Sequence, residues 1–392
     1  MASNIFQSIQ HSPYQPPSSM AIDILGLLWP KNSSLFNPNK NITKHARYYE
    51  YADQLTLLCE FVESLQQKGL ARAFGVIKFV DLRRSHLTFP GKNKAHVVRD
   101  LDNIDHVFKG FDFNAFLDHG PDFHAHQRDT MLHEICALAA MPPHRNIMPC
   151  PQILVVVDDE AGRERICGFL QPVMRTGTLD DQVIKANKTD LRIPLAQQAR
   201  WCHGMAAGLL HTHRVGGTYH MDVKPGNTLI DDDDETRLID WEQSGVSMFT
   251  HSKEVTIDQA AEETGEPDAN GRRRIVYIPR EDQTRVNLPW GYPKWNVFPE
   301  WHETCPRAAE LAEVFSLGRV MWMLFERLEQ NPDPTVWTER SQDIPSSWID
   351  MSNRCQQKDP NDRPELDEVV EFWRREEERY SFRGANGSAS RG

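Results

Sequence analysis

One segment of the sequence, residues 219–245, places several polar side chains at spacings that suit a single chemical site. It reads YHMDVKPGNTLIDDDDETRLIDWEQSG. Lys224 and Asn227 follow Asp222 by two and five positions, and eighteen positions after Asp222 comes a second aspartate, Asp240. Phosphoryl transfer needs a carboxylate at the attacking hydroxyl, oxygen ligands for Mg²⁺ and a cation on the transferred phosphate. The segment contains all of these groups; the alternative is a polar turn between two strands with solvated acids.

The same residues resemble the catalytic loop and the metal-binding segment of protein kinases. The family pattern is H-R-D-L-x-x-x-N followed by D-F-G. In this chain the two parts read His220-Met221-Asp222-Val223-Lys224-Pro225-Gly226-Asn227 and Asp240-Trp241-Glu242. The resemblance implies that Asp222 is the catalytic base and that Lys224 contacts the γ-phosphate of ATP. It also implies that Asn227 and Asp240 are the ligands of Mg²⁺.

A lysine and a glutamate upstream extend the resemblance. In kinases a strand lysine reaches the α- and β-phosphates and pairs with a glutamate on the following helix. Lys109 ends a strand-like run, and Glu134 lies in the next expected helix, ahead of an H-x-N-I turn at His144-Arg145-Asn146-Ile147. Each residue alone would be read as a solvated surface charge. Because they occur in the order seen in kinases, Lys109 and Glu134 are predicted to belong to the ATP-binding site.

The remaining nucleotide contacts are less sharply marked. The phosphate-covering loop of the family, G-x-G-x-x-G-x-V, corresponds to residues 90–97, which contain a single glycine. Gly91 and Val97 are its candidate contacts, but fewer glycines limit how closely backbone N–H groups approach phosphate. The resemblance places further nucleotide contacts at Gln171 and Val173, in the connection between lobes, and at Leu229.

Three later matches concern the scaffold rather than the chemistry. Phe298-Pro299-Glu300 stands where the family has A-P-E, and Arg363 lies in a late D-P-x-x-R-P segment. In protein kinases this glutamate and this arginine form a buried ion pair. Glu313 opens a run that resembles the D-V-W-S-L-G start of the central helix. These matches favour a protein kinase over a small-molecule phosphotransferase, which usually lacks this ending.

The order of the expected elements predicts an α+β fold. Three short strands are expected in residues 87–111 and two more at 153–158 and 165–171, with a helix at 126–141 among them. Helices dominate afterwards, at residues 194–213, 309–328 and 365–380. This order is typical of the two-lobed protein-kinase fold, with a small β-rich lobe at residues 81–171 and a larger helical lobe at residues 178–383.

The segments outside that domain, residues 81–383, have different compositions. Residues 1–43 are rich in Ser, Pro and polar side chains, which predicts a disordered extension and linker. Residues 44–80 are predicted to form a helical extension, because apolar residues recur at helical spacing from 45 to 70. This helix either packs on the small lobe or binds a regulatory partner. Residues 384–392 are predicted to form a disordered tail.

Composition excludes several classes of protein. The chain has 392 residues and a formal net charge of −12, whereas general nucleic-acid binders are usually basic. No run approaches the roughly 20 apolar residues of a membrane helix, so no membrane contact is expected. The seven cysteines include no close C-x-x-C pair, which indicates reduced thiols in a cytosolic or nuclear protein.

The resemblance, which covers about residues 87–380, therefore implies an ATP- and Mg²⁺-dependent kinase acting on Ser or Thr hydroxyls of a protein substrate. A second hypothesis is a pseudokinase, a nucleotide-binding or scaffold module favoured by the glycine-poor loop and the altered D-F-G. A small-molecule phosphotransferase is the third. The sequence leaves the substrate and the oligomeric state open.

Met221 generates a prediction about regulation. In kinases that use it, the arginine at this position receives the phosphate of the activation loop, and methionine cannot pair with phosphate. We expect that replacing every Ser, Thr and Tyr in residues 244–284 leaves phosphate transfer measurable. Loss of all transfer in that variant, with the fold intact by circular dichroism, would contradict the prediction.

Overall fold

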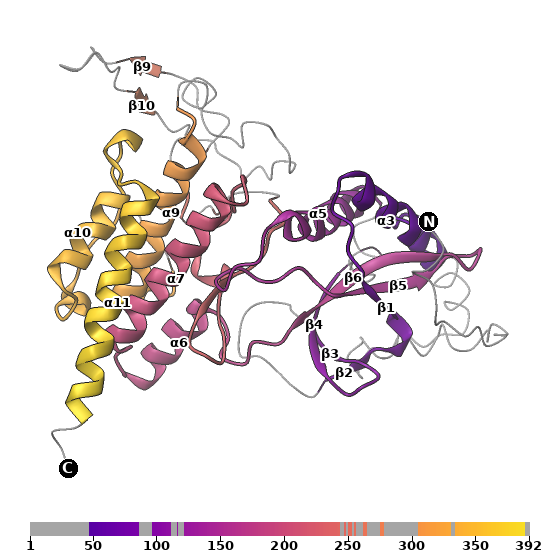
Figure 1. Ribbon diagram of the computed structural model, residues 1–392, viewed down its shortest axis with the longest axis horizontal. Helices are drawn as coiled ribbons and strands as arrows, with labels where there is room; N and C mark the ends of the chain where they lie inside the picture. Colours follow the sequence, from indigo (N-terminus) through magenta and orange to yellow (C-terminus); the bar gives the residue numbers. More distant parts are fainter. Residues whose placement is uncertain are drawn as a thin grey trace.

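The protein consists of a sheet-rich part and a helical part, which lie at opposite ends of the computed structural model (Figure 1). The structure describes residues 47–85, 96–110, 116, 121–243, 247, 250–252, 255, 262–264, 275–277, 305–330 and 334–388. The predicted α+β class is confirmed, because the strands of the large sheet precede most of the long helices. The disordered extension predicted for residues 1–43 lies outside the described residues.

Six strands form one sheet in the order β1-β5-β6-β4-β3-β2. Their bounds are β1 Gly75–Lys78, β2 Arg83–Arg84, β3 His96–Arg99, β4 Asp105–Gly110, β5 Ile153–Asp158 and β6 Glu164–Pro172. Every neighbouring pair is antiparallel except β1 and β5, which run parallel. The two strands predicted after residue 150 are confirmed as β5 and β6. Of the three predicted in residues 87–111, β3 and β4 are described, while residues 86–95 lie outside the described part.

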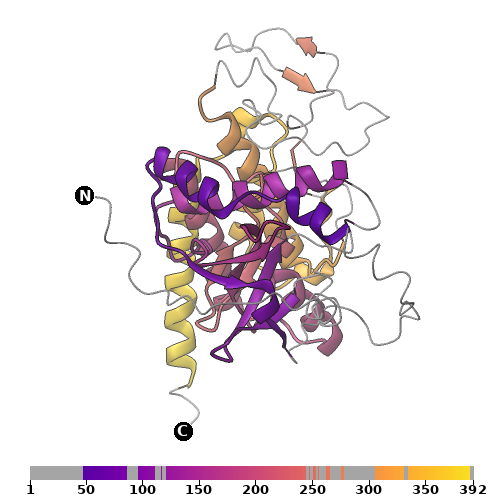
Figure 2. The same cartoon turned by 90° about the vertical axis from the view of Figure 1, so that its right-hand side faces the viewer.

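Both faces of the sheet are covered, which explains why β5 reads as an uninterrupted apolar run. Successive side chains of a strand point to opposite faces. Leu154 and Val156 pack against helices α3 and α5, and Val155 and Val157 pack against Tyr51 and its neighbours on the other face. Helix α3 spans Leu58–Gln67 and α5 spans Pro121–Ala140. Figure 2 shows the indigo N-terminal helices and α5 lying over the strands.

The single helix predicted for residues 45–70 is wrong in its continuity. Residues 47–53 are helical, the chain then leaves the helix, and α3 begins at Leu58. The break has a tertiary cause, because the backbone at Thr56 accepts a hydrogen bond from Ile166 at 3.0 Å, and Leu57 bridges to Arg165. Pairing with β6 thus overrides local helix propensity. Helix α3 packs on the sheet through Phe61 and Leu65, as the packing alternative expected.

The predicted extension of residues 44–80 also contains a strand. Residues 75–78 form β1, which pairs in register with β5 from Gly75 opposite Ile153 to Lys78 opposite Val156. Four residues are too few for a period-two pattern to be read from sequence. The sheet therefore begins before residue 81, where the kinase-like domain was predicted to start.

Helices make up the second part of the protein. They are α6 Leu179–Thr189, α7 Leu195–Arg214, α9 Ala308–Phe325, α10 Ser346–Cys355 and α11 Leu366–Ser388. Two two-stranded antiparallel sheets accompany them, one of β7 Thr228–Ile230 with β8 Thr236–Leu238 and one of β9 Glu262–Thr264 with β10 Ile275–Tyr277. Helix α9 is buried nearly all round, as its uniformly apolar sequence predicts. A cluster of Phe325, Trp348 and Trp373 closes the core between α9, α10 and α11.

A close approach of α7 to β8 fixes where the site can form. A Cβ atom at Gly204 would lie 2.2 Å from Thr236 Oγ1 and 2.7 Å from Asn146 Nδ2, so the backbone of α7 needs glycine there. Asn146 in turn donates from Nδ2 to the carbonyl of Thr236 at 2.9 Å. Helix α7, the turn after α5 and strand β8 are thereby held together just ahead of Asp240.

Two smaller expectations can be compared with the structure. The disordered tail predicted for residues 384–392 is wrong for residues 384–388, which continue helix α11. Extending an existing helix fixes one residue for each hydrogen bond gained, so even a small, polar sequence can follow. None of the helices in the described ranges has the length and apolar character needed to cross a bilayer.

Glu310 generates a prediction about acid stability, because it links three helices. Its carboxylate accepts hydrogen bonds from Arg214 of α7, from Arg307 and from the backbone N–H of Leu366. Burial raises the pKa of Glu310, but the bonds from Arg214 and Arg307 outweigh it and lower the pKa to about 2, from 4.5.

A group whose pKa falls on folding stabilises the folded state above its unfolded pKa. This contribution is therefore present at neutral pH and is lost as the pH falls from about 4.5 towards about 2. We expect Glu310→Gln to lower the free energy of unfolding at neutral pH and to change it little at the acid end of this pH range. Urea denaturation across this range measures it, with the exposed ion-pair variant Glu365→Gln as the control. An equal loss at every pH would contradict the assignment.

Candidate active site

Lys109 lies at the centre of a charge cluster built from three elements. It projects from β4, and its Nζ atom lies 2.6 Å from Glu134 Oε2 on α5 and 2.8 Å from Asp240 Oδ1 after β8. Glu134 is almost fully buried, and its second oxygen accepts a hydrogen bond from the backbone N–H of Trp241 at 3.3 Å. The structure thus brings together three predicted site residues that are far apart in the sequence.

Burial and charge oppose one another in this cluster. Burial acts to lower the pKa of Lys109, but the carboxylates of Asp240 and Glu134 raise it above its usual range, so the ammonium stays charged. Burial raises the pKa of Glu134, and the Lys109 ammonium offsets only part of that shift. Burial also acts to raise the pKa of Asp240, but Lys109 and Lys224 lower it. The cluster is stable only while lysine and carboxylates remain together.

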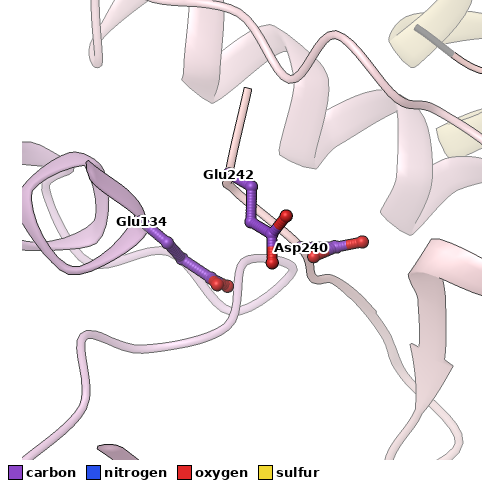
Figure 3. Close-up of side chains that lie close together, drawn as sticks. All are labelled: Glu134, Asp240 and Glu242. Atoms are coloured by element: carbon purple, nitrogen blue, oxygen red, sulfur yellow. The ribbon is translucent and has the colours of Figure 1, made fainter. Parts of the chain in front are cut away.

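Glu242 adds a third carboxylate that sequence reasoning did not assign to the site. One carboxylate oxygen each from Glu134, Asp240 and Glu242 lie within 4.8 Å of one another (Figure 3). The Oε1 atom of Glu242 is 3.8 Å from Lys109 Nζ. Carboxylate oxygens are the ligands that Mg²⁺ prefers, and these three carboxylates lie around the Lys109 ammonium. The donor set therefore fits a divalent cation.

The loop around Asp222 is held in a strained conformation by a residue of helix α9. Met221 has a φ of +78°, a left-handed value that a non-glycine side chain rarely adopts. Glu313 of α9 accepts the backbone N–H groups of both His220 and Met221 on its Oε1 atom, each at 2.6 Å. Its Oε2 atom lies 2.6 Å from Nε2 of His213. Glu313 thus fixes the backbone one residue before Asp222.

The two carboxylate oxygens of Asp222 have different environments. Oδ2 accepts from Lys224 Nζ at 2.5 Å and from Asn227 Nδ2 at 2.9 Å. Oδ1 is enclosed and has no hydrogen-bond partner among the described residues. An enclosed acceptor without a donor costs free energy, so it marks a place where a donor from a ligand would be stabilised. A substrate hydroxyl is a donor of that kind.

Contacts with Asp222 also orient the side-chain amide of Asn227. Its Nδ2 atom donates to both the carbonyl and the Oδ2 atom of Asp222, at 2.9 Å each. When the NH₂ group of a side-chain amide donates in one direction, its carbonyl oxygen points in the other. Oδ1 of Asn227 is therefore the atom left to coordinate a cation, the role the resemblance implies.

The lysine cluster and the loop around Asp222 are joined through the residue before Asp240. The backbone N–H of Ile239 donates to the carbonyl of Asn227 at 3.0 Å, and His220 Nε2 donates to the carbonyl of Ile239 at 2.8 Å. The rings of His220 and Trp241 have centroids 4.6 Å apart, and Trp241 is fully buried. Asp240 itself has a φ of +72°, so its side-chain direction depends on these flanking bonds.

One face of the sheet carries a row of predicted nucleotide contacts. Val97 of β3 and Gln171 of β6 both lie directly opposite Val107 of β4, and Lys109 is two residues further along β4. Directly opposed residues share a face, as do residues two apart. Val97 and Gln171 are buried, and Nε2 of Gln171 has no hydrogen-bond partner within the described ranges. An unmatched donor therefore lies in the row beside Lys109.

Other predicted residues are less closely tied to this cluster. Val173 is half-buried in the segment that follows β6, and Leu229 is half-buried on β7, where it bridges to Thr178. Gly91 lies outside the described residues, as does Glu300. The pairing expected between Glu300 and Arg363 is therefore not described, although Arg363 is buried and donates to the carbonyl of Leu311 at 2.9 Å.

No protein-family model matches the chain, and no curated protein sequence matches it.

Glu313 generates a prediction that concerns structure alone. Glu313→Ala leaves two buried backbone N–H groups without an acceptor, and each unmet donor costs about 1–3 kcal/mol. We expect a loss of at least about 2 kcal/mol in the free energy of unfolding, measured by urea denaturation. Glu339→Ala, a change of an exposed residue of the same type, is the control. A loss no larger than that of the control would contradict the role of Glu313.

Proposed function

We propose that the protein is an ATP- and Mg²⁺-dependent protein kinase that transfers the γ-phosphate to Ser or Thr hydroxyls of a protein substrate. In this proposal the sheet-rich and helical parts are the two lobes of a kinase fold. The observation that carries it is the enclosed Oδ1 atom of Asp222, which has no hydrogen-bond partner among the described residues, in a loop that is hydrogen-bonded to Ile239, the residue before Asp240 of the Lys109–Glu134–Asp240 cluster. A hydroxyl acceptor and a phosphate-binding lysine are thereby held in one framework.

Each residue has a role that follows from its contacts. Asp222 would accept the hydrogen bond of the attacking hydroxyl and orient its oxygen toward the phosphate. Lys224, already 2.5 Å from Asp222, would place a positive charge beside the transferred group. Asp240 and Asn227 would hold Mg²⁺, which neutralises charge on the phosphates when bound. Lys109 would turn from Asp240 to the α- and β-phosphates while Glu134 keeps it in position.

A scaffold or pseudokinase function is the second candidate, and one observation favours it. Lys109 is bonded to Asp240 at 2.8 Å, and Glu242 lies 3.8 Å from the same nitrogen. Three carboxylates lie around the Lys109 ammonium that the phosphates would need. ATP binds only if Mg²⁺ releases Lys109 from Asp240. A small-molecule phosphotransferase remains a third candidate without an observation that favours it.

Radiolabelled γ-phosphate transfer tests the proposal. Purified protein, Mg²⁺ and ATP would be incubated with generic acceptor proteins, beside Asp222→Asn and the exposed turn variant Asp232→Asn. Because a positioned general base contributes about 10²–10⁴-fold, we expect Asp222→Asn to lower transfer by about a hundredfold or more and Asp232→Asn to leave it unchanged. Absence of transfer by the unaltered protein, with no Mg²⁺-dependent thermal shift by ATP, would reject the kinase proposal in favour of the scaffold.

A further inference from the structure

The side chain of Gln243, three residues after Asp240, contacts two separate parts of the fold. It is buried, and its φ of +48° lies in the left-handed region, which costs free energy for a non-glycine residue. Its amide contacts three residues: His133 at 2.7 Å, Thr218 at 3.1 Å, and the backbone carbonyl of Tyr219. These contacts reach helix α5 in one direction and the start of the catalytic segment in the other.

The chemistry of the partners fixes the direction of each bond. The carbonyl of Tyr219 can only accept, so the amide nitrogen of Gln243 must face it. The amide oxygen then faces His133 and can only accept, so Nε2 of His133 must carry a proton. The arrangement thus has a single consistent assignment of donors and acceptors.

The position of His133 gives this contact its consequence. His133 immediately precedes Glu134, and residues so close on one helix move together. Glu134 must keep an Oε2–Nζ distance of 2.6 Å to Lys109. At the other end, Tyr219 directly precedes His220, whose N–H is bound to the buried Glu313. Gln243 therefore connects a fixed point of the helical part to the helix that carries Glu134.

We propose that Gln243 is a positioning residue that holds α5, and with it Glu134, against Lys109 through its bond to His133. The proposal rests on the proposed kinase function and deepens it, because it names an uncharged contact that sets the alignment of the lysine and glutamate. Gln243 touches no substrate in this scheme. The contact is made by an uncharged side chain in the segment after Asp240.

A double-mutant cycle tests the route of the effect. Coupled residues have interaction energies that correspond to several-fold up to a hundredfold, so we expect Gln243→Leu to lower kcat for phosphate transfer about tenfold. In a Glu134→Gln background, where the aligned pair is already lost, the same change should cost less than about twofold. The KM for the protein substrate should stay within about twofold, because the contact acts on the lysine side of the site. Equal losses in both backgrounds would overturn the proposal.

Variants of the partner keep the test independent of folding defects. His133→Phe removes the donor but keeps a ring, and it should reproduce the loss seen in Gln243→Leu. His133→Gln restores an N–H donor and should recover part of the rate. Gln357→Leu is the matched control. Gln357 is exposed, and its Nε2 atom donates to the carbonyl of Asn353 on α10. Failure of His133→Phe to reduce the rate would also overturn the proposal.

Hydrogen exchange separates failure of this proposal from failure of the proposed function. If the unaltered protein transfers no phosphate, the kinase function is rejected, but the contact can still be measured. We expect the backbone amides of residues 127–140 to exchange about tenfold faster in Gln243→Leu than in Gln357→Leu, because α5 loses an attachment. Unchanged exchange in α5 would show that Gln243 does not hold the helix.

Discussion

The geometry of the whole site depends on one buried carboxylate, that of Glu313. Its Oε1 atom gathers two successive backbone N–H groups, a pairing that is possible only because Met221 adopts a left-handed conformation. The strain at Met221 is repaid by charge-assisted hydrogen bonds in a region without competing water. Since α9 is buried nearly all round, the reference point for the loop around Asp222 is a core element of the helical part.

A second constraint is the number of charges around Lys109. Removing Lys109 would leave Glu134 buried without its counter-charge. Removing Glu134 would leave Lys109 with its contact to Asp240. Glu242 makes this cluster unlike that of a site with glycine at the same position, because it adds a third carboxylate beside Glu134 and Asp240. In the proposed function, Mg²⁺ would offset the charge of these carboxylates, and their contacts with Lys109 are what favour the scaffold alternative.

The sequence predicted those parts of the structure that depend on local pattern. Long helices such as α7 and α9 follow from their apolar spacing, and Lys109 and Glu134 were found because they occupy separate elements in a characteristic order. Gln243 could not be found in this way, since its role depends on a left-handed backbone and on contacts with residues more than twenty positions away. The break before α3 and the strand β1 were missed for the same reason, because both result from pairing with strands of the sheet. Gly91 lies outside the described residues, so its assignment stays a prediction.

The two ends of the described sheet have a consequence for how copies of the protein meet. The outer strands, β1 and β2, are four and two residues long, and they carry Lys78 and the pair Arg83-Arg84. Short edge strands are poor templates for strand addition, because they present few unpaired backbone groups to a second copy. With helices over both faces as well, the sheet offers neighbouring molecules little backbone to pair with. The N-terminal segment that completes the core therefore also leaves only a four-residue strand at this edge of the described sheet.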